Sequence, residues 1–279
     1  MPSLGCKTGC LFWTDITAGK IHRLNPSTWQ HETIYEGEPV GGFTLQENGE
    51  LLLFRVNDIA LLDSQGNISK VRDFSDQGMN RFNDVIADPR GRVFAGTIGK
   101  HPEAGLYRMD LNGEIAKLFG GTGCSNGMGF SPDQKKFYWT NTTTRHIFEF
   151  DFDAESGEIS QRKVFYATTP DEGIPDGLTL DAEGYVWSAR WGGASIIRHS
   201  PDGKVLGRIR FPSVNVSSLC FGGKNLDELF VTVAKNVNDP APHVKGLFHI
   251  PVGFRGTTEF RWRIKFDRSA SLKSHNPVH

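Results

Sequence analysis

The chain has 279 residues, a formal net charge of −1 and a pI near 6.8. This balance excludes a strongly basic protein that binds nucleic acid or a membrane surface, and no apolar run approaches the roughly 18 residues of a membrane span. The four cysteines show no CxxC spacing, so we expect free thiols, with Cys124 and Cys220 not bonded to each other, in a cytoplasmic protein that is a monomer or a weak dimer.

One sequence motif recurs along the chain. It consists of an opening residue, a strand with alternating apolar residues and a turn that contains glycine. Its clearest copy is the segment 173–184, in which Leu178 and Leu180 alternate with Thr179 as in a strand. The copies open at Gly41, Asn83, Asn126, Asp176 and Ser217. The intervals between them are 42, 43, 50 and 41 residues, which indicates one array of repeats rather than two domains.

Each repeat continues with further predicted strands. Second strands are expected at 10–15, 51–54, 92–97, 136–140, 185–188 and 228–232, and third strands at 20–24, 105–109, 146–150, 195–199 and 246–250. Hairpin turns such as Asp202-Gly203 lead into a fourth strand. Four antiparallel strands in each of six repeats predict an all-β protein, a six-bladed β-propeller.

The two ends of the chain carry separate expectations. The inner strand of the first blade is expected at Pro2 to Gly5 and shortened, because its opening position falls at or before Met1. Residues 1–266 are predicted to form one propeller domain. Residues 267–279 are predicted to form a polar C-terminal tail that is loosely held.

The opening residues of the repeats are candidates for a site, because the inner strands of a propeller surround a central channel. Singly, each of these polar side chains is more simply explained as a group that bonds its own loop. Together, the amide of Asn126 and the carboxylate of Asp176 favour a bound hard cation. Arg81 fits either a surface ion pair or a clamp for an anion or a carbonyl oxygen.

Several motifs resemble those of the family of regucalcin (senescence marker protein), gluconolactonase and luciferin-regenerating enzyme. They are Arg81-Phe82-Asn83-Asp84, Phe94-Ala95-Gly96-Thr97, Ser125-Asn126-Gly127, Ile174-Pro175-Asp176-Gly177 and Cys220-Phe221-Gly222-Gly223. The sequence Trp191-Gly192-Gly193 resembles the bacterial sugar-lactonase members. The resemblance runs from residue 9 to residue 255.

The resemblance implies a six-bladed propeller with one divalent metal ion in its channel that hydrolyses aldonic-acid lactones such as gluconolactone. Asn126 and Asp176 match the family's metal ligands, and Asp176 would also act as the catalytic base. Arg81 and Asn83 match the residues that bind the sugar lactone. The ion is expected to be Ca²⁺ or Zn²⁺, with Mn²⁺, Mg²⁺ and Fe²⁺ also compatible.

Two features of the family pattern are not matched clearly. A metal-binding Glu of a Glu-x-Pro motif would fall directly before Met1 if Pro2 is the motif's proline, so the chain as written is expected to bind metal weakly and to be a poor lactonase. For a further Glu that contacts substrate, only Glu103 and His101 are nearby candidates.

Three alternatives to a sugar lactonase stay open at this point. The chain could be a calcium-binding regulatory propeller without chemistry, a propeller that serves as a scaffold for other proteins, or a hydrolase of a non-sugar lactone or a phosphoester.

Overall fold

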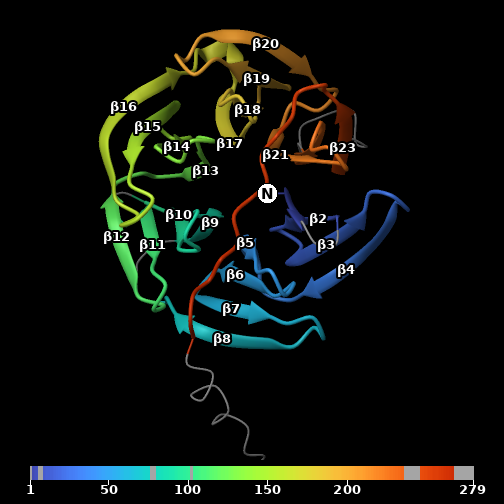
Figure 1. Ribbon diagram of the computed structural model, residues 1–279, viewed down its shortest axis with the longest axis vertical. Helices are drawn as coiled ribbons and strands as arrows, with labels where there is room; N and C mark the ends of the chain where they lie inside the picture. Colours follow the sequence, from blue (N-terminus) through green and yellow to red (C-terminus); the bar gives the residue numbers. More distant parts are fainter. Residues whose placement is uncertain (1, 6–8, 76–79, 101–102, 236–245, 267–279) are drawn as a thin grey trace, which may run out of the picture.

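The computed structural model describes residues 2–5, 9–75, 80–100, 103–235 and 246–266. Figure 1 shows six small antiparallel sheets arranged as blades around a central axis. In each blade the strands follow one another from the centre to the rim in chain order. The predicted six-bladed propeller is therefore confirmed.

The strands have the following bounds. Blade one contains β1 (Pro2–Gly5), β2 (Cys10–Asp15), β3 (Lys20–Asn25) and β4 (Gln30–Glu36), and blade two contains β5 (Val40–Leu45), β6 (Leu51–Arg55), β7 (Asp58–Leu62) and β8 (Ile68–Asp73). Blade three contains β9 (Arg81–Ala87), β10 (Val93–Ile98), β11 (Gly105–Met109) and β12 (Ile115–Gly120), and blade four contains β13 (Ser125–Phe130), β14 (Lys136–Asn141), β15 (His146–Phe152) and β16 (Ile159–Ala167). Blade five contains β17 (Ile174–Leu180), β18 (Val186–Trp191), β19 (Ser195–His199) and β20 (Val205–Arg210), and blade six contains β21 (Val216–Gly222), β22 (Glu228–Val233) and β23 (Gly246–Pro251).

Burial decreases from the inner strand of each blade to the outer strand. The residues change accordingly from apolar to polar. Strand β6 is apolar from Leu51 to Phe54, and both of its faces pack in the core between blades. Strand β8 at the rim is polar and almost wholly exposed. Aromatic side chains fill the wedges between blades, as where Phe94 packs against Phe130 and Phe137. The core is thus divided among the interfaces between blades.

The inner strands close the ring. They contact one another in the order β1, β5, β9, β13, β17, β21 and back to β1. Strand β1 has four residues, against six or seven in the other inner strands, and pairs with β2 over its full length. The shortened inner strand predicted at Pro2 to Gly5 is confirmed. In blade six the described residues supply three strands, one fewer than in each other blade.

The segment after β23, residues 252–266, crosses one end of the channel and was not predicted from the sequence. Figure 1 shows it as a red trace that passes the middle of the ring toward β8. Its backbone N–H groups bond blade six at Leu226, blade two at Leu45 and blade three at Leu111. Trp262 of this segment is fully buried between blades two and three. The segment therefore ties distant blades together.

A small cavity of about 60 Å³ lies in the channel against this crossing segment. Its walls come from the ends of inner strands, including Ile86, Phe130 and Leu180, and its floor from Thr257, Thr258, Glu259 and Phe260. Glu259 contacts the Ser3 hydroxyl of β1. The crossing segment thus lines the channel at the ends of the inner strands.

The remaining expectations about the chain divide as follows. Cys124 and Cys220 are free thiols, as predicted. The tail 267–279 lies outside the described residues. The 3-10 turn η1 (Pro170–Glu172) is the only helical element among the residues that the model describes, and none of their helices has the length and apolarity needed to cross a membrane.

Candidate functional site

The opening residues of the repeats coincide with irregularities in the pairing of five inner strands. Gly41 and Ser217 are each one extra residue opposite their second strand. In blade four, Asn126 and Gly127 lie opposite a single residue of β14, and in blade five Asp176 and Gly177 lie opposite a single residue of β18. Such bulges re-aim side chains and are common beside active sites. They explain why polar residues in these strands gather at one end of the channel.

The glycine after each candidate metal ligand is required by close packing of the inner strands. A Cβ atom on Gly127 would lie 2.3 Å from the backbone nitrogen of Leu178, and one on Gly177 would lie 2.3 Å from the Ser218 Oγ. Neither distance is possible for a real Cβ atom. The Asn-Gly and Asp-Gly pairs of the motifs therefore serve to bring neighbouring blades together at the site.

Arg81 and Asn83 form one half of the site. Arg81 Nη1 donates to Asn83 Oδ1 at 2.6 Å and to the Phe82 carbonyl at 2.8 Å. Asn83 Nδ2 donates to the carbonyl of Ser125 on the next inner strand at 2.9 Å. A guanidinium carries five N–H donors, so these bonds leave donors for a ligand. Of the two alternatives for Arg81, the surface ion pair fits less well, because the side chain is half-buried and bonds the oxygens of Asn83 and Phe82.

Asn126 and Asp176 form the other half and are linked through Thr142. The Thr142 hydroxyl donates to the Pro175 carbonyl at 2.7 Å, so it accepts from Asn126 Nδ2 at 3.1 Å. This pattern places the amide nitrogen of Asn126 toward Thr142 and leaves its Oδ1 for another partner. Because Pro175 directly precedes Asp176, the same hydroxyl connects both candidate ligands.

The carboxyl groups at this end of the channel have unusual proton affinities. Burial, and second the charge of Asp84, raise the pKa of Asp176 well above its ordinary value, while contacts with Asn126 and Arg81 act the other way. Burial likewise raises the pKa of Asp84. The Asp176 side chain is half-buried rather than fully enclosed. Two carboxyl groups in a confined space resist carrying charge together.

Cys124 lies between the two halves of the site. Its Sγ receives the amide groups of both Asn83 and Asn126 at 3.9 Å. Burial, and second the charge of Asp176, raise the pKa of this thiol to about 11. The thiol is therefore protonated at neutral pH, which is the state of an inert cysteine rather than of a nucleophile.

The remaining candidate residues from the sequence are not part of the hydrogen-bonded group formed by Arg81, Asn83, Asn126 and Thr142. The Ser217 hydroxyl donates to the Thr232 carbonyl at 3.0 Å in its own blade, as the simpler explanation of that residue expects. Glu103 lies between β10 and β11, and its buried Oε2 has no hydrogen-bond partner within the part of the chain that the structure describes. His101 lies outside the described residues.

The donor set fits a hard divalent cation. Asn126 and Asp176 present a carbonyl and a carboxylate oxygen on adjacent bulges, which is the chemistry that such ions prefer. The raised pKa of Asp176 marks a carboxyl group whose negative charge is poorly compensated, and a cation would compensate it. No cluster of three or more His, Cys, Asp or Glu suited to a metal occurs among the described residues.

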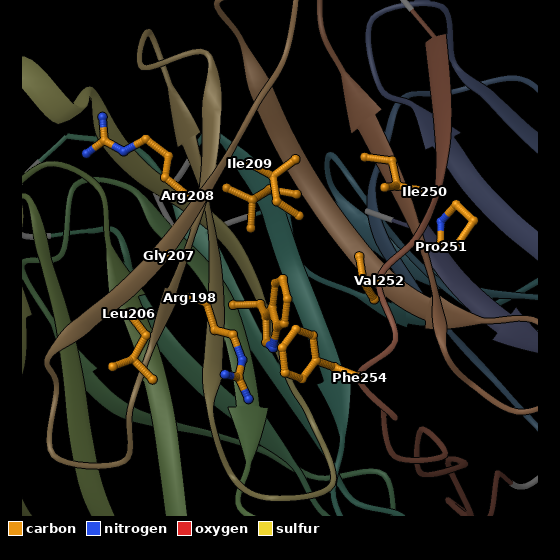
Figure 2. Close-up of a pocket in the computed structure, with 11 residues that line it drawn as sticks. Arg198, Leu206, Gly207, Arg208, Ile209, Ile250, Pro251, Val252 and Phe254 are labelled. Carbon is orange, nitrogen blue, oxygen red and sulfur yellow. The ribbon is translucent and has the colours of Figure 1, made fainter.

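A separate cavity of about 400 Å³ lies between blades five and six, outside the channel. Figure 2 shows its lining, in which the side chains of Leu206, Ile209 and Phe254 are apolar. Arg198 at its edge is paired with Asp181 at 2.8 Å. None of the candidate site residues lines this cavity.

Fold and site together define a six-bladed propeller with a cation-suited polar site at one end of its channel. Residues 4–235 match the family model described as SMP-30/Gluconolactonase/LRE-like region, so the chain belongs to this family. The predicted resemblance is confirmed.

Individual relatives are similar over nearly the whole chain. The pentonolactonase XacC of Haloferax volcanii is 37% identical, with 90% of this chain and 89% of that protein covered. Human regucalcin is 32% identical, with 90% of both covered. The solved structure of a calcium-binding protein, regucalcin, from Agrobacterium tumefaciens is 26% identical with a TM-score of 0.89, covering 94% of this chain and 92% of that one.

Three residues of the site were missed by sequence reasoning. Asp84 follows Asn83, and strand alternation would place it on the opposite face, but both lie opposite the single residue Gly96. Thr142 follows the end of β14 and belongs to no repeated motif. Cys124 directly precedes the Ser125 motif, which is the one signal that could have drawn attention to it.

Proposed function

We propose that this chain is a divalent-metal-dependent hydrolase of sugar-acid lactones, such as gluconolactone and its five-carbon counterparts. The observation that carries the proposal is the meeting of Asn126 and Asp176 with Arg81 and Asn83 at one end of the channel. Similarity to a pentonolactonase at 37% identity supports the same substrate class.

Binding and orientation of the lactone fall to Arg81 and Asn83. The free N–H groups of Arg81 donate to sugar hydroxyls and to the ring oxygen, and its bond to Asn83 fixes the orientation of both side chains. Glu103, whose buried Oε2 has no partner among the described residues, would accept a bond from a further hydroxyl. A bound metal ion would polarise the lactone carbonyl and stabilise the negative charge that develops on its oxygen.

Asp176 is the proposed general base. A water oxygen attacks the carbonyl carbon, and Asp176 takes the proton that this water loses. The ring C–O bond then breaks, and its oxygen takes back the proton held by Asp176 and leaves as a hydroxyl group, so that one lactone and one water give one aldonic acid.

The test is the substitution Asp176→Asn, assayed with aldonolactones and added Ca²⁺, Zn²⁺ or Mn²⁺. It keeps the shape of the side chain but removes the base and one ligand charge, so we expect hydrolysis to fall to background. Ser217→Ala is the matched control, because Ser217 occupies the equivalent bulge of blade six but bonds within its own blade. Retained turnover in Asp176→Asn would refute the role of this residue.

A second candidate is a calcium-binding protein without chemistry, which the similarity to regucalcin favours. The same donor set would serve it. In this case calorimetry would detect Ca²⁺ binding that Asp176→Asn abolishes, while no lactone would be turned over with any of the three metals.

A further inference from the structure

Two histidines meet on the surface of blade one. They lie on its two outer strands, away from the candidate site in the channel. His22 lies on β3 and His31 on β4, and the pairing of these strands shifts in register just before His22. His22 Nδ1 lies 3.2 Å from His31 Nε2. His31 is exposed and His22 half-buried, so the pair is open to solvent.

The surroundings hold both rings in place. The indole of Trp13 lies 5.2 Å from the His22 ring and 5.3 Å from the His31 ring, and it stacks on the latter. Thr33 Oγ1 lies 3.2 Å from His22 Nδ1 as a third polar atom. Burial and the neighbouring His31 lower the pKa of His22, with Lys20 adding to this and Asp15 opposing it. In the tautomer that carries its proton on Nε2, His22 offers the lone pair of Nδ1 to a ligand.

The separation of the two nitrogens matches chelation of a metal ion. Zinc binds imidazole nitrogen at about 2.0–2.1 Å, so two such ligands at a tetrahedral angle lie about 3.4 Å apart, and at a right angle about 2.9 Å apart. The observed 3.2 Å lies between these values. We propose that His22 and His31 form a surface site for a first-row transition dication such as Zn²⁺, Ni²⁺ or Cu²⁺.

The proposed histidine site differs from the channel site in its chemistry. Imidazole suits Zn²⁺, Ni²⁺ and Cu²⁺, whereas Ca²⁺ takes oxygen ligands. With two protein nitrogens and the Thr33 hydroxyl nearby, the remaining positions around the ion are open to water or to an added ligand. This inference does not depend on lactone hydrolysis.

The experiment uses the full chain without an affinity tag, freed of metal with a chelator, in the Asp176→Asn background so that the channel site is weakened. Zn²⁺ is titrated by calorimetry into this protein and into versions that also carry His22→Asn or His31→Asn. We expect each added substitution to weaken Zn²⁺ binding by about tenfold or more, because one imidazole alone cannot chelate. Ca²⁺ titrations should not differ among the three proteins.

A second measurement uses Trp13 as a reporter. Cu²⁺ bound between the two rings should quench the fluorescence of Trp13. The part of the quenching that Trp13 contributes is the part that disappears in Trp13→Phe, and we expect the same part to disappear in His31→Asn. Calorimetry on Trp13→Phe checks that the ion still binds there. Circular dichroism confirms folding of each variant. Equal Zn²⁺ affinity with and without the two histidines would overturn the proposal and leave the contact as a hydrogen bond between two rings.

Discussion

At the scale of single residues, the site depends on side chains that touch no ligand. Thr142 accepts from the Asn126 amide and donates to the Pro175 carbonyl, so one hydroxyl orients both candidate metal ligands. Partners of this kind that orient metal ligands contribute about 10- to 100-fold to metal affinity.

Thr142→Val keeps the shape of the side chain and removes the hydroxyl. We expect affinity for Zn²⁺ or Mn²⁺ at the channel site to fall about 10- to 100-fold, because the Asn126 amide is then free to rotate. Thr142→Ser restores the hydroxyl and should bind nearly as the unmodified chain does. Calorimetry compares the three proteins, and equal affinity in the valine variant would contradict the assigned role.

The buried side chain of His199 predicts how the stability of the fold depends on pH. The side chain is fully buried and faces the guanidinium of Arg190, whose Nη2 lies 2.9 Å from His199 Nε2. Burial, and second this positive charge, lower the pKa of His199 to about 3. Between that value and its ordinary pKa of 6.5 only the unfolded chain binds the proton, so stability is complete above about pH 6.5 and decreases as the pH falls toward 3.

Replacing His199 by glutamine removes this proton-linked loss of stability. The free energy of unfolding of the unmodified chain should fall by up to about 1.4 kcal/mol more per pH unit, between pH 6 and pH 4, than that of His199→Gln. Urea unfolding at several pH values measures the difference. Parallel pH curves for the two proteins would show that His199 is not buried in its neutral form.

At the scale of elements, the repeats predicted which residues meet but not how. The period of the opening residues was sufficient to place Asn126 and Asp176 on neighbouring inner strands. The bulges that aim them inward are set by pairing between strands, which a single sequence does not display. For the same reason Asp84 was missed, because alternation alone assigns it to the wrong face.

Gly177→Ala tests the close approach of inner strands. The added methyl would overlap Ser218 Oγ and lie 2.8 Å from the Ser218 Cα, so β17 and β21 would have to separate. We expect a loss of about 1–3 kcal/mol in the free energy of unfolding and a loss of lactone turnover. Gly207→Ala is the matched control, since an added methyl there meets nothing within 4 Å. Similar stability of both variants would show that the strands tolerate the separation.

At the scale of the whole molecule, the ring is secured by the segment 252–266 as well as by strand pairing. Its contacts reach blades six, two and three. No pattern in the segment predicts these partners, because they lie up to about two hundred residues earlier in the chain and none repeats a blade motif. The blades could be predicted from local periodicity, whereas this crossing follows only from the assembled ring.

Trp262→Ala measures what this segment contributes. The side chain is 1% exposed and packs with residues of blades two and three, so its removal should cost about 3–5 kcal/mol of unfolding free energy. Trp29, which is 55% exposed, provides the control, and Trp29→Ala should change stability little. An effect of Trp262→Ala as small as that of the control would mean that the segment lies on the ring without stabilising it.

The segment that crosses the channel has a consequence for turnover. Among the described residues, 257–260 line the channel at the ends of the inner strands, opposite the candidate site, so we expect a lactone to arrive and an aldonate to leave at the site's own end. The aldonate keeps most of the hydroxyl groups by which Arg81 and Asn83 would recognise the lactone. In the proposed reaction, accumulated aldonate therefore competes with the next lactone for the free enzyme. The rate of hydrolysis then falls as conversion proceeds, even while lactone is plentiful.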